Sequence, residues 1–433
     1  MERYAQMKNN GVGWIQDIPT GWGVRVLFQL DDQVKNKNKD LVEKNLLSLS
    51  YGKIKRKDIN NPEGLLPESF DGYNIIEADD IVLRLTDLQN DHTSLRVGQA
   101  KERGIITSAY TTLRPSAFVN PQYLYYVLHA YDLIKGFYGM GAGVRQGLNY
   151  DEVKAIKVPF PSVSEQSRIV KYLNDQEEQI DSIIEEATRS IDDYRRWRTA
   201  IIYEAITKGV ENPKGLKNSG VEWIGQIPTN WRMCSIKRLT TKIGSGKTPS
   251  GGAEVYSDEG VLFLRSQNIY NTGLVLDEVS HISDEIDADM KNTRVEYRDV
   301  LLNITGGSIG RCCIFDLIDT RANVNQHVCI LRTKKDELLP EFLRYFWNSS
   351  VGPIVVGYYQ TGGNRQGLNF EQIGQVKIPL CALDTQKQIV RYLDKECSAI
   401  DDLIREKQAL VTDLEAYKRS LIYETVTGRR KVV

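Results

Sequence analysis

This chain of 433 residues contains an internal repeat. Three stretches recur in the same order: WIQDIPTGW (14–22) as WIGQIPTNW (223–231), RQGLN (145–149) as RQGLN (365–369), and QSRIVKYL (166–173) as QKQIVRYL (386–393). A spacing of more than 200 residues is far longer than the period of a solenoid. The repeat therefore predicts a duplicated pair of domains.

Between these recurring stretches the two halves differ. Residues 46–57 read LLSLSYGKIKRK, whereas residues 240–252 read TTKIGSGKTPSGG. The recurring stretches are thus shared by both halves, whereas the sequence between them is not. A common scaffold that presents two different binding surfaces would have this pattern.

Each half ends in a stretch that favours one long helix. Residues 163–208 and 384–427 contain neither Pro nor Gly, and apolar residues recur every seven positions, which is typical of a coiled coil. The first copy has Leu173, Ile180, Ala187, Tyr194 and Ile201, with Ile183, Ile184, Ile191 and Trp197 in the adjoining stripe. The second copy has Leu393, Ile400, Leu414 and Leu421, with Leu403, Leu410 and Tyr417 beside them and Lys407 as an interruption. Gly209 and Gly428 are the stop signals.

The rest of each half is rich in Gly, Pro, Tyr and short β-branched runs, so it should form a mixed globule of strands and helices. The predicted fold class is α+β: two mixed α/β domains separated by two long antiparallel coiled-coil helices, with pseudo-twofold internal symmetry. The expected boundaries are 1–162 for the first domain, 163–209 for the central helix, 210–383 for the second domain and 384–433 for the C-terminal helix.

Composition limits the class of protein. The chain is 41% hydrophobic and 26% charged, as in ordinary globular proteins, and its formal net charge of −1 excludes a uniformly basic coat. Any contact with nucleic acid must come from local patches. The six cysteines show no CxxC spacing, so neither a zinc site nor a disulfide framework is expected. No signal peptide or apolar run of membrane length is found, which predicts a cytoplasmic protein.

Motifs for catalysis fail when they are tested. Gly244-Ser-Gly-Lys-Thr248 resembles the end of a phosphate-binding loop, but Thr241 stands where that loop requires Gly. Asn120-Pro-Gln-Tyr123 resembles the Asn-Pro-Pro-Tyr loop of adenine methyltransferases, yet Gln122 replaces the second Pro, and the stretch is better interpreted as a helix start. The four histidines are scattered. A binding protein is therefore favoured over an enzyme.

Taken together, the duplicated stretches resemble the DNA-specificity subunit of type I restriction-modification systems, over nearly the whole chain. LRLTDLQN (83–90) with GIITSAY (104–110) resembles one recurrent type of target recognition domain. IGSGKTP (243–249), RSQNI (265–269) and NVNQH (323–327) resemble another.

This resemblance implies a function without catalysis in the chain itself. Each target recognition domain would read half of a split, asymmetric sequence in double-stranded DNA, and the helices would set the gap between the half-sites. Two methyltransferase subunits would dock on the helices and methylate adenine with S-adenosylmethionine, which they and not this chain would bind. Motor-nuclease subunits would join where the complex also restricts phage DNA. No membrane contact is implied.

Base reading needs Arg, Lys, Asn, Gln, Ser and Thr at groove edges, and phosphate binding needs cations and small hydroxyls. In the first domain we expect DNA contacts from Ser50, Tyr51, Gly52, Lys53, Arg84, Thr86, Gln89, Asn90, Arg103, Ser108 and Tyr110. In the second domain we expect them from Ser245, Lys247, Thr248, Arg265, Gln267, Asn268, Ser308, Arg311, Asn323, Asn325 and Gln326. No catalytic or metal-binding residue is expected.

Repeated residues cannot by themselves encode two different half-sites. For Arg145, Gln146, Arg365 and Gln366 we therefore favour phosphate or structural roles. The basic run from Lys53 to Lys57 is interpreted either as a phosphate contact or as a solvated edge, and the repeated tryptophans as packing anchors.

Two other classes of protein remain as alternatives. A free-standing methyltransferase or nuclease would bind S-adenosylmethionine or a metal as an isolated chain. A coiled-coil adaptor would lack the steep salt dependence of DNA binding.

Overall fold

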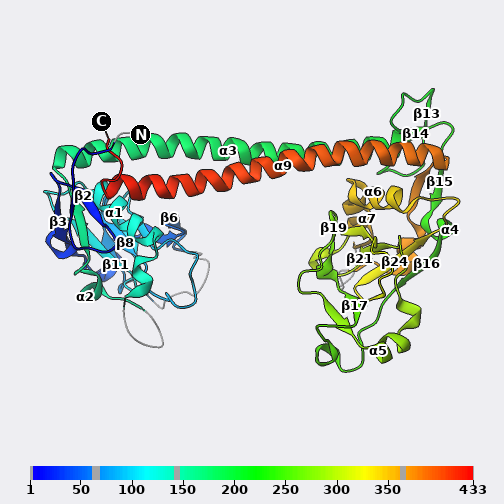
Figure 1. Ribbon diagram of the computed structural model, residues 1–433, viewed down its shortest axis with the longest axis horizontal. Coiled ribbons are helices and arrows are strands. Elements are labelled where there is room, and N and C mark those ends of the chain that lie inside the picture. Colours follow the sequence, from blue (N-terminus) through cyan, green and yellow to red (C-terminus); the bar gives the residue numbers. More distant parts are fainter. Residues whose placement is uncertain (1–2, 61–68, 141–146, 361–366, 433) are drawn as a thin grey trace. The chain divides into compact units, whose positions relative to one another are not determined.

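The computed structural model describes residues 3–60, 69–140, 147–360 and 367–432. They divide into two compact units, Met1–Ala187 with Ala409–Val433, and Thr188–Gln408. Each unit mixes small sheets with helices and keeps one half of each of two long helices, α3 (Val163–Lys208) and α9 (Leu383–Val426) (Figure 1). The predicted α+β class with two long helices is confirmed.

This division by packing differs from the division by sequence. It cuts α3 and α9 near their middles, because each globular part stays with the helix halves that it packs against. The C-terminal half of α9 thus belongs with the N-terminal part of the chain. The first unit is in effect a circular permutation of the second, whose chain runs without a break from the end of α3 into its globule.

Local signals explain where the long helices begin and end. The Ser162 hydroxyl accepts a hydrogen bond from the Glu165 N–H at 3.3 Å, which caps the start of α3. Gly209, directly after α3, has φ +86°, and Gly428, just after α9, has φ +76°. Glycine adopts this left-handed conformation without a steric penalty, so both helices stop there.

In the first unit the two helices run antiparallel, because the early part of α3 contacts the late part of α9. Ile180 of α3 belongs to the same buried cluster as Leu421 of α9. Beside this cluster the Lys418 ammonium lies 2.9 Å from an Asp181 carboxylate oxygen.

The second unit repeats this arrangement with the roles of the helices exchanged. Its buried cluster joins Ile202 of α3 with Leu393 of α9, and Arg198 Nε lies 2.9 Å from Asp401 Oδ1. The pairs Asp181–Lys418 and Asp401–Arg198 are related by the 220-residue offset of the repeat. The antiparallel pairing predicted for the helices is therefore present in both units.

Part of the predicted coiled-coil stripe was placed wrongly. Ile183 and Trp197 are 45% and 49% exposed, and Leu410 and Tyr417 are also exposed. A helix that contacts its partner through a narrow seam buries only about two residues in seven, so the adjoining positions face outward. Trp197 and Tyr417 stand at equivalent positions of the repeat.

The same antiparallel four-stranded sheet recurs in both units. In the first unit its order is β4-β11-β8-β9, and in the second it is β16-β24-β21-β22. The first set is β4 (Asp31–Gln33), β11 (Thr111–Pro115), β8 (Ile81–Leu83) and β9 (Val97–Gln99). The second set is β16 (Thr240–Ser245), β24 (Val328–Thr333), β21 (Val300–Asn303) and β22 (Cys312–Ile314). The common scaffold inferred from the repeat thus contains a sheet with the same strand order in both units.

A second sheet in each unit contains one parallel pair. In the first unit β10 (Gly104–Ile106) runs parallel to β5 (Leu46–Ser50), with β7 (Asn74–Ile76) and β6 (Lys53–Lys57) outside them. In the second unit β23 (Ala322–Val324) runs parallel to β17 (Val261–Leu264), with β20 (Ser280–Ile282) at its side.

Smaller elements complete the frame. Among the described residues, two two-stranded pairings recur between the units, and one hairpin belongs to the second unit alone. The strands are β1 (Met7–Asn9) with β2 (Asp17–Pro19), β13 (Leu216–Asn218) with β14 (Gln226–Pro228), β3 (Gly23–Val26) with β12 (Lys157–Phe160), β15 (Arg232–Ser235) with β25 (Lys377–Leu380), and β18 (Ile269–Tyr270) with β19 (Gly273–Leu274). The helices are α1 (Pro121–Leu133), α2 (Tyr150–Val153), α4 (Ile236–Leu239), α5 (Asp284–Asp289), α6 (Pro340–Asn348), α7 (Val351–Gln360) and α8 (Phe370–Gln375).

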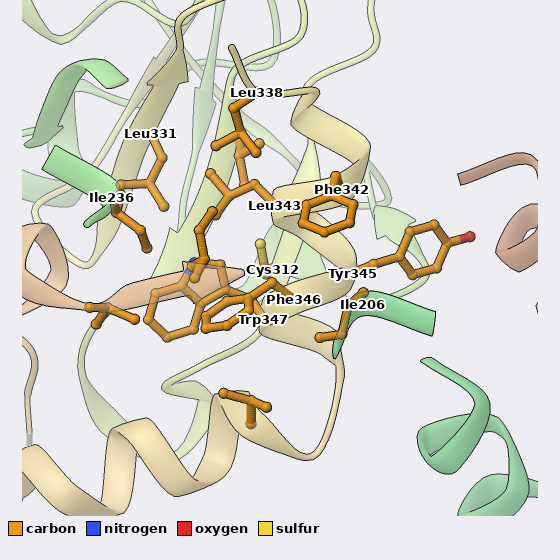
Figure 2. Packing of buried hydrophobic residues seen from close by; sticks show 14 of the residues in the cluster. Ile206, Ile236, Cys312, Leu331, Leu338, Phe342, Leu343, Tyr345, Phe346 and Trp347 are labelled. Atoms are coloured by element: carbon orange, nitrogen blue, oxygen red, sulfur yellow. The ribbon is translucent and has the colours of Figure 1, made fainter. Parts of the chain in front are cut away.

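The largest core that the described residues form lies in the second unit, where α6 packs between the sheet and the long helices. Phe342, Phe346 and Trp347 of α6 share one buried cluster with Leu331 of β24 and Ile206 of α3 (Figure 2). The apolar face of α6 therefore fixes the globule to the helix half.

A repeated buried glutamine explains one of the recurring stretches. Gln166 is fully buried; it accepts a hydrogen bond from the Asn120 N–H at 2.9 Å and donates to the Pro161 carbonyl at 3.0 Å. Gln386 does the same with the Leu339 N–H and the Cys381 carbonyl. Each glutamine ties the start of α1 or α6 to the start of a long helix.

The repeated tryptophans pack as expected. Trp22 and Trp231 are buried, and Trp14 and Trp223 pack edge-on or tilted against Tyr131 and Tyr358.

Candidate nucleic-acid interface

In the first unit, most of the predicted contacts gather around the end of β8. Arg84 and Thr86 follow this strand, and the exposed Gln89 and Asn90 lie in the loop of residues 86–94. The Asn90 side chain donates to Asp87 Oδ1 at 2.9 Å within the loop. Contact of Gln89 with a base edge stays a prediction.

The turn between β5 and β6 lies beside the same strand end. Ser50 and Lys53 flank this turn, in which Tyr51 is exposed and Gly52 is buried. A Cβ at Gly52, whose φ is +76°, would lie 3.0 Å from Leu95 Cβ. Glycine therefore allows the turn to approach the chain that follows the 86–94 loop, and two predicted segments come together.

The basic run forms strand β6, which pairs only with β5 among the described residues. Lys53, Lys55 and Arg56 are exposed on it. Arg56 pairs with Glu102, which raises the pKa of the guanidinium. An exposed edge with several cations can contact phosphates or remain solvated, as the sequence left open.

The remaining predicted residues of this unit lie farther along the chain. Arg103 is exposed and forms ion pairs with Glu43 at 3.1 Å and Glu77 at 2.6 Å. Ser108 is exposed, whereas the partly buried Tyr110 packs against a small apolar cluster. To contact DNA, Arg103 would have to break its ion pairs with these two carboxylates and bind a phosphate instead.

In the second unit, two predicted segments meet directly. The Gly246 N–H donates to the Asn325 carbonyl at 3.1 Å, and the Thr248 hydroxyl bonds to the Gln326 amide. A Cβ at Gly246 would lie 1.4 Å from the Val324 carbonyl oxygen, so this approach requires glycine. Ser245, Lys247 and Thr248 thereby share one surface with Gln326.

A histidine that the sequence analysis did not select continues this contact. His327 Nε2 lies 3.1 Å from the Gln326 amide nitrogen, and His327 Nδ1 lies 2.5 Å from the Thr305 hydroxyl. The amide nitrogen can only donate, so His327 Nε2 accepts and Nδ1 carries the proton toward Thr305. The sequence gives no signal for this contact of His327, because only the fold brings Thr305 to it.

The other polar residues of this unit surround β17 and β21. Gln267 is exposed beside the partly buried Arg265. Ser308 accepts from the Asn303 amide at 3.0 Å, and the Arg311 guanidinium stacks over Tyr270 at 4.6 Å. Lys247 reaches the Asp289 carbonyl at 3.2 Å.

Three predicted asparagines are buried. The Asn268 amide accepts from the Arg265 N–H and donates to the Val275 carbonyl. The Asn323 amide donates to the buried Asp287 and accepts from Thr293, both at 2.6 Å. Asn325 is buried and accepts from the His327 N–H. In this structure these side chains hold the loops, and their DNA contact stays a prediction that would require rearrangement.

Arg145, Gln146, Arg365 and Gln366 lie outside the described residues. The residues that follow them are anchored alike in both units. The Leu148 N–H donates to the Leu85 carbonyl at 2.8 Å, and the Leu368 N–H donates to the Ile304 carbonyl at 2.9 Å. Leu148 and Leu368 are thus fixed beside the strand end that carries the predicted reading loop.

Within the described parts of the chain, no cluster of three His, Cys, Asp or Glu side chains is arranged to hold a metal ion. No described helix combines the length and the hydropathy that crossing a bilayer requires.

Comparisons with known proteins agree with this architecture. The model of the type I restriction modification DNA specificity domain matches residues 27–190 and again residues 228–412. A protein of Methanocaldococcus jannaschii assigned as the MjaX type I restriction enzyme specificity subunit is 25% identical over 96% of each chain. The MjaVIII specificity subunit of the same organism is 24% identical over 76% of this chain and 75% of its own.

A solved chain from a type I R-M system has the same fold. It superposes with a TM-score of 0.73 at 14% identity and covers 94% of this chain and 98% of its own length.

Two copies of one frame with different loops define a duplicated recognition protein. Because its domain model matches in two copies over most of the sequence, the chain belongs to the type I restriction modification DNA specificity family. The resemblance seen in the sequence is confirmed, as is the assignment to specificity subunits rather than to catalytic ones.

Proposed function

We propose that this chain reads a bipartite, asymmetric target in double-stranded DNA, one half-site with each unit, and positions partner subunits for adenine methylation or cleavage. One observation carries the proposal. The ends of β8 and β21, equivalent strands in sheets of the same order, carry loops of different sequence in the two units. Equal frames would hold both loops in the same manner toward DNA, and unequal loops would read different bases.

Polar side chains at both strand ends support base reading. The exposed amides of Gln89 and Gln326 can each offer a donor and an acceptor to one base, which is the arrangement that recognises adenine. Exposed cations such as Lys53 and Lys247 lie nearby and supply the charge that phosphates need.

The surface of the long helices supports docking of two methyltransferase subunits. Trp197 and Tyr417 are exposed aromatic side chains at equivalent positions of the repeat. Exposed aromatics are common anchors at protein interfaces. A repeated pair would give two copies of one partner the same contact, and motor-nuclease subunits would join in a restricting complex.

In this proposal S-adenosylmethionine belongs to the methyltransferase subunits and the helices set the gap between half-sites. Location in the cytoplasm, with the DNA, is part of the same proposal.

The direct test is methylome sequencing of a host that expresses this chain with its methyltransferase partner. We expect one new methylated motif with two different half-sites separated by a fixed gap. A motif with identical halves, or no new motif with an assembled complex, would contradict the proposal.

Binding measurements separate the competing classes. The assembled complex should bind its target with an affinity that falls steeply as salt rises, because phosphate contacts release counterions. An adaptor would show no such slope. A free-standing enzyme would instead bind S-adenosylmethionine or a metal as the isolated chain in equilibrium dialysis.

A further inference from the structure

We infer that Arg96 is a positioning residue that holds the 86–94 loop of the first unit in the shape needed for base reading. The inference rests on the proposed function and adds a residue that the sequence analysis did not select. Arg96 lies on the chain between this loop and β9, and its side chain is fully buried.

The donors of the Arg96 guanidinium go to the backbone of the loop and to one tyrosine. Nη1 donates to the Thr86 carbonyl at 2.9 Å. Nη2 donates to the Asp87 carbonyl at 3.3 Å and also to the Asp91 carbonyl. One planar group thus joins both ends of the loop, a task that fits the fixed fork of arginine and that a lysine ammonium cannot reproduce.

Tyr138 completes the brace from the other side. Its hydroxyl accepts from Arg96 Nε at 3.1 Å and donates to the Asp91 carbonyl at 2.9 Å. The guanidinium also lies over the tyrosine ring, 5.5 Å from its centre. The Arg96 N–H is itself fixed by Asp132 of α1 at 2.6 Å.

Asp91 fixes the far end of the loop. Its carboxylate accepts from the Ser94 N–H at 2.9 Å and from the Thr93 N–H at 3.2 Å, and it lies 3.5 Å from the Arg96 guanidinium. These hydrogen bonds, led by those of Ser94, hold the pKa of Asp91 well below its usual range. The carboxylate is therefore charged and available to the brace at neutral pH.

Further contacts of the loop lie at its surface, where Lys135 Nζ donates to the His92 carbonyl at 2.6 Å and the His92 ring stacks on Tyr138. Leu88 is buried, but Asp87, Gln89, Asn90, His92 and Thr93 are exposed. A free polar loop would lose conformational entropy when it ordered on DNA, and a braced loop has lost it on folding. The brace should therefore affect discrimination between bases and leave phosphate affinity unchanged.

The test uses the complete complex of this chain with its methyltransferase partner. Once the target is known, binding is measured to four duplexes: the target, the target with half-site one scrambled, with half-site two scrambled, and with both scrambled. The ratio of Kd values between scrambled and intact half-sites is the discrimination. The variants are Arg96→Gln and Tyr138→Phe.

Arg114→Gln is the matched control. Arg114 forms a two-point ion pair with the buried Asp80 in the same unit, but it does not contact the loop. We expect Arg96→Gln to lower discrimination at half-site one by about tenfold or more, since one mismatched base pair has an effect of this size. Discrimination at half-site two, affinity for the fully scrambled duplex and its salt slope should match the wild type.

Tyr138→Phe keeps the ring and removes only the hydroxyl, so it tests the inference even if Arg96→Gln fails to fold. It should lower discrimination at half-site one by a smaller factor than Arg96→Gln does. The Tm of the variant should equal that of the wild type. The inference is overturned if folded variants discriminate like the wild type, if all duplexes lose affinity by one factor, or if Arg114→Gln gives the same loss. A wild-type complex that does not discriminate at all would instead refute the proposed function.

Discussion

Arg198 of α3 lies 2.9 Å from Asp401 of α9, and the 220-residue repeat carries this ion pair onto Lys418 and Asp181. In the first pair the cation lies on α3 and the acid on α9, and in the second pair the cation lies on α9 and the acid on α3. This exchange is expected when a duplicated helix pairs antiparallel with its own copy. Partly exposed ion pairs add little stability by themselves. Their value here is that they mark the register of the helices in each unit.

Register gives a sharp test of the helices as spacers. Matched deletion of residues 186–192 and 407–413 removes seven residues from each helix and keeps the four residues that form the two ion pairs. Seven residues correspond to about 10 Å of helix, or about three base pairs of DNA. We expect the gap in the methylated motif to shorten by about that amount. Deletion from α3 alone should impair assembly, and an unchanged gap with full methylation would contradict the spacer role.

Substitution of the exposed glutamines should separate the half-sites. Gln89→Ala should relax or abolish recognition of one half-site, and Gln267→Ala the other, each by about 1–3 kcal/mol if a bidentate base contact is lost. Methylome sequencing of the two mutant complexes measures both half-sites together. Each variant is the control for the other, and unchanged recognition at both half-sites would refute the assignment.

The buried glutamines should matter for stability and not for specificity. Gln166→Ala leaves the Asn120 N–H and the Pro161 carbonyl without their partner, so we expect a loss of about 1–3 kcal/mol in the free energy of unfolding. Gln386→Ala should do the same in the second unit. Urea denaturation measures the loss, with Gln179→Ala, at an exposed position of α3, as the near-neutral control.

Asp31 should make the first unit less stable as pH rises. Burial raises the pKa of this carboxyl to about 7, and its Oδ2 has no hydrogen-bond partner among the described residues, while the Tyr150 hydroxyl bonds to Oδ1 at 3.0 Å. A raised pKa means that the folded state favours the protonated acid, so its contribution is complete below pH 4 and is lost as pH rises toward 7. We expect Asp31→Asn to gain about 2–4 kcal/mol relative to wild type between pH 4 and pH 8. Denaturation at several pH values measures this difference, and a constant difference would contradict it.

Much of the architecture could be predicted because its signals are local. The absence of Pro and Gly, the heptads and the glycines at positions 209 and 428 place α3 and α9 to within a residue or two. The outward direction of Ile183 and Trp197 was missed, because heptad spacing does not tell a seam position from its neighbour.

The candidate interface was less predictable because its contacts are not local. Gln267 is exposed and Asn268, the next residue, is buried, a difference set by the turn after β17 and not by residue type. The meeting of Thr248 with Gln326, and of Thr305 with His327, depends on the order of strands in the sheets. The role of Arg96 depends on carbonyl groups, which a sequence does not display.

The circular permutation of the first unit has a consequence for biosynthesis. Leu421, Ile422 and Val426 supply part of its core, Gly428 packs on Pro19 and Trp22, and Arg430 is buried behind them. The ribosome makes these residues only after it has made the second globule. The first globule must therefore wait, with part of its apolar surface uncovered, until the second globule and α9 have been translated, whereas the second globule has all its parts earlier.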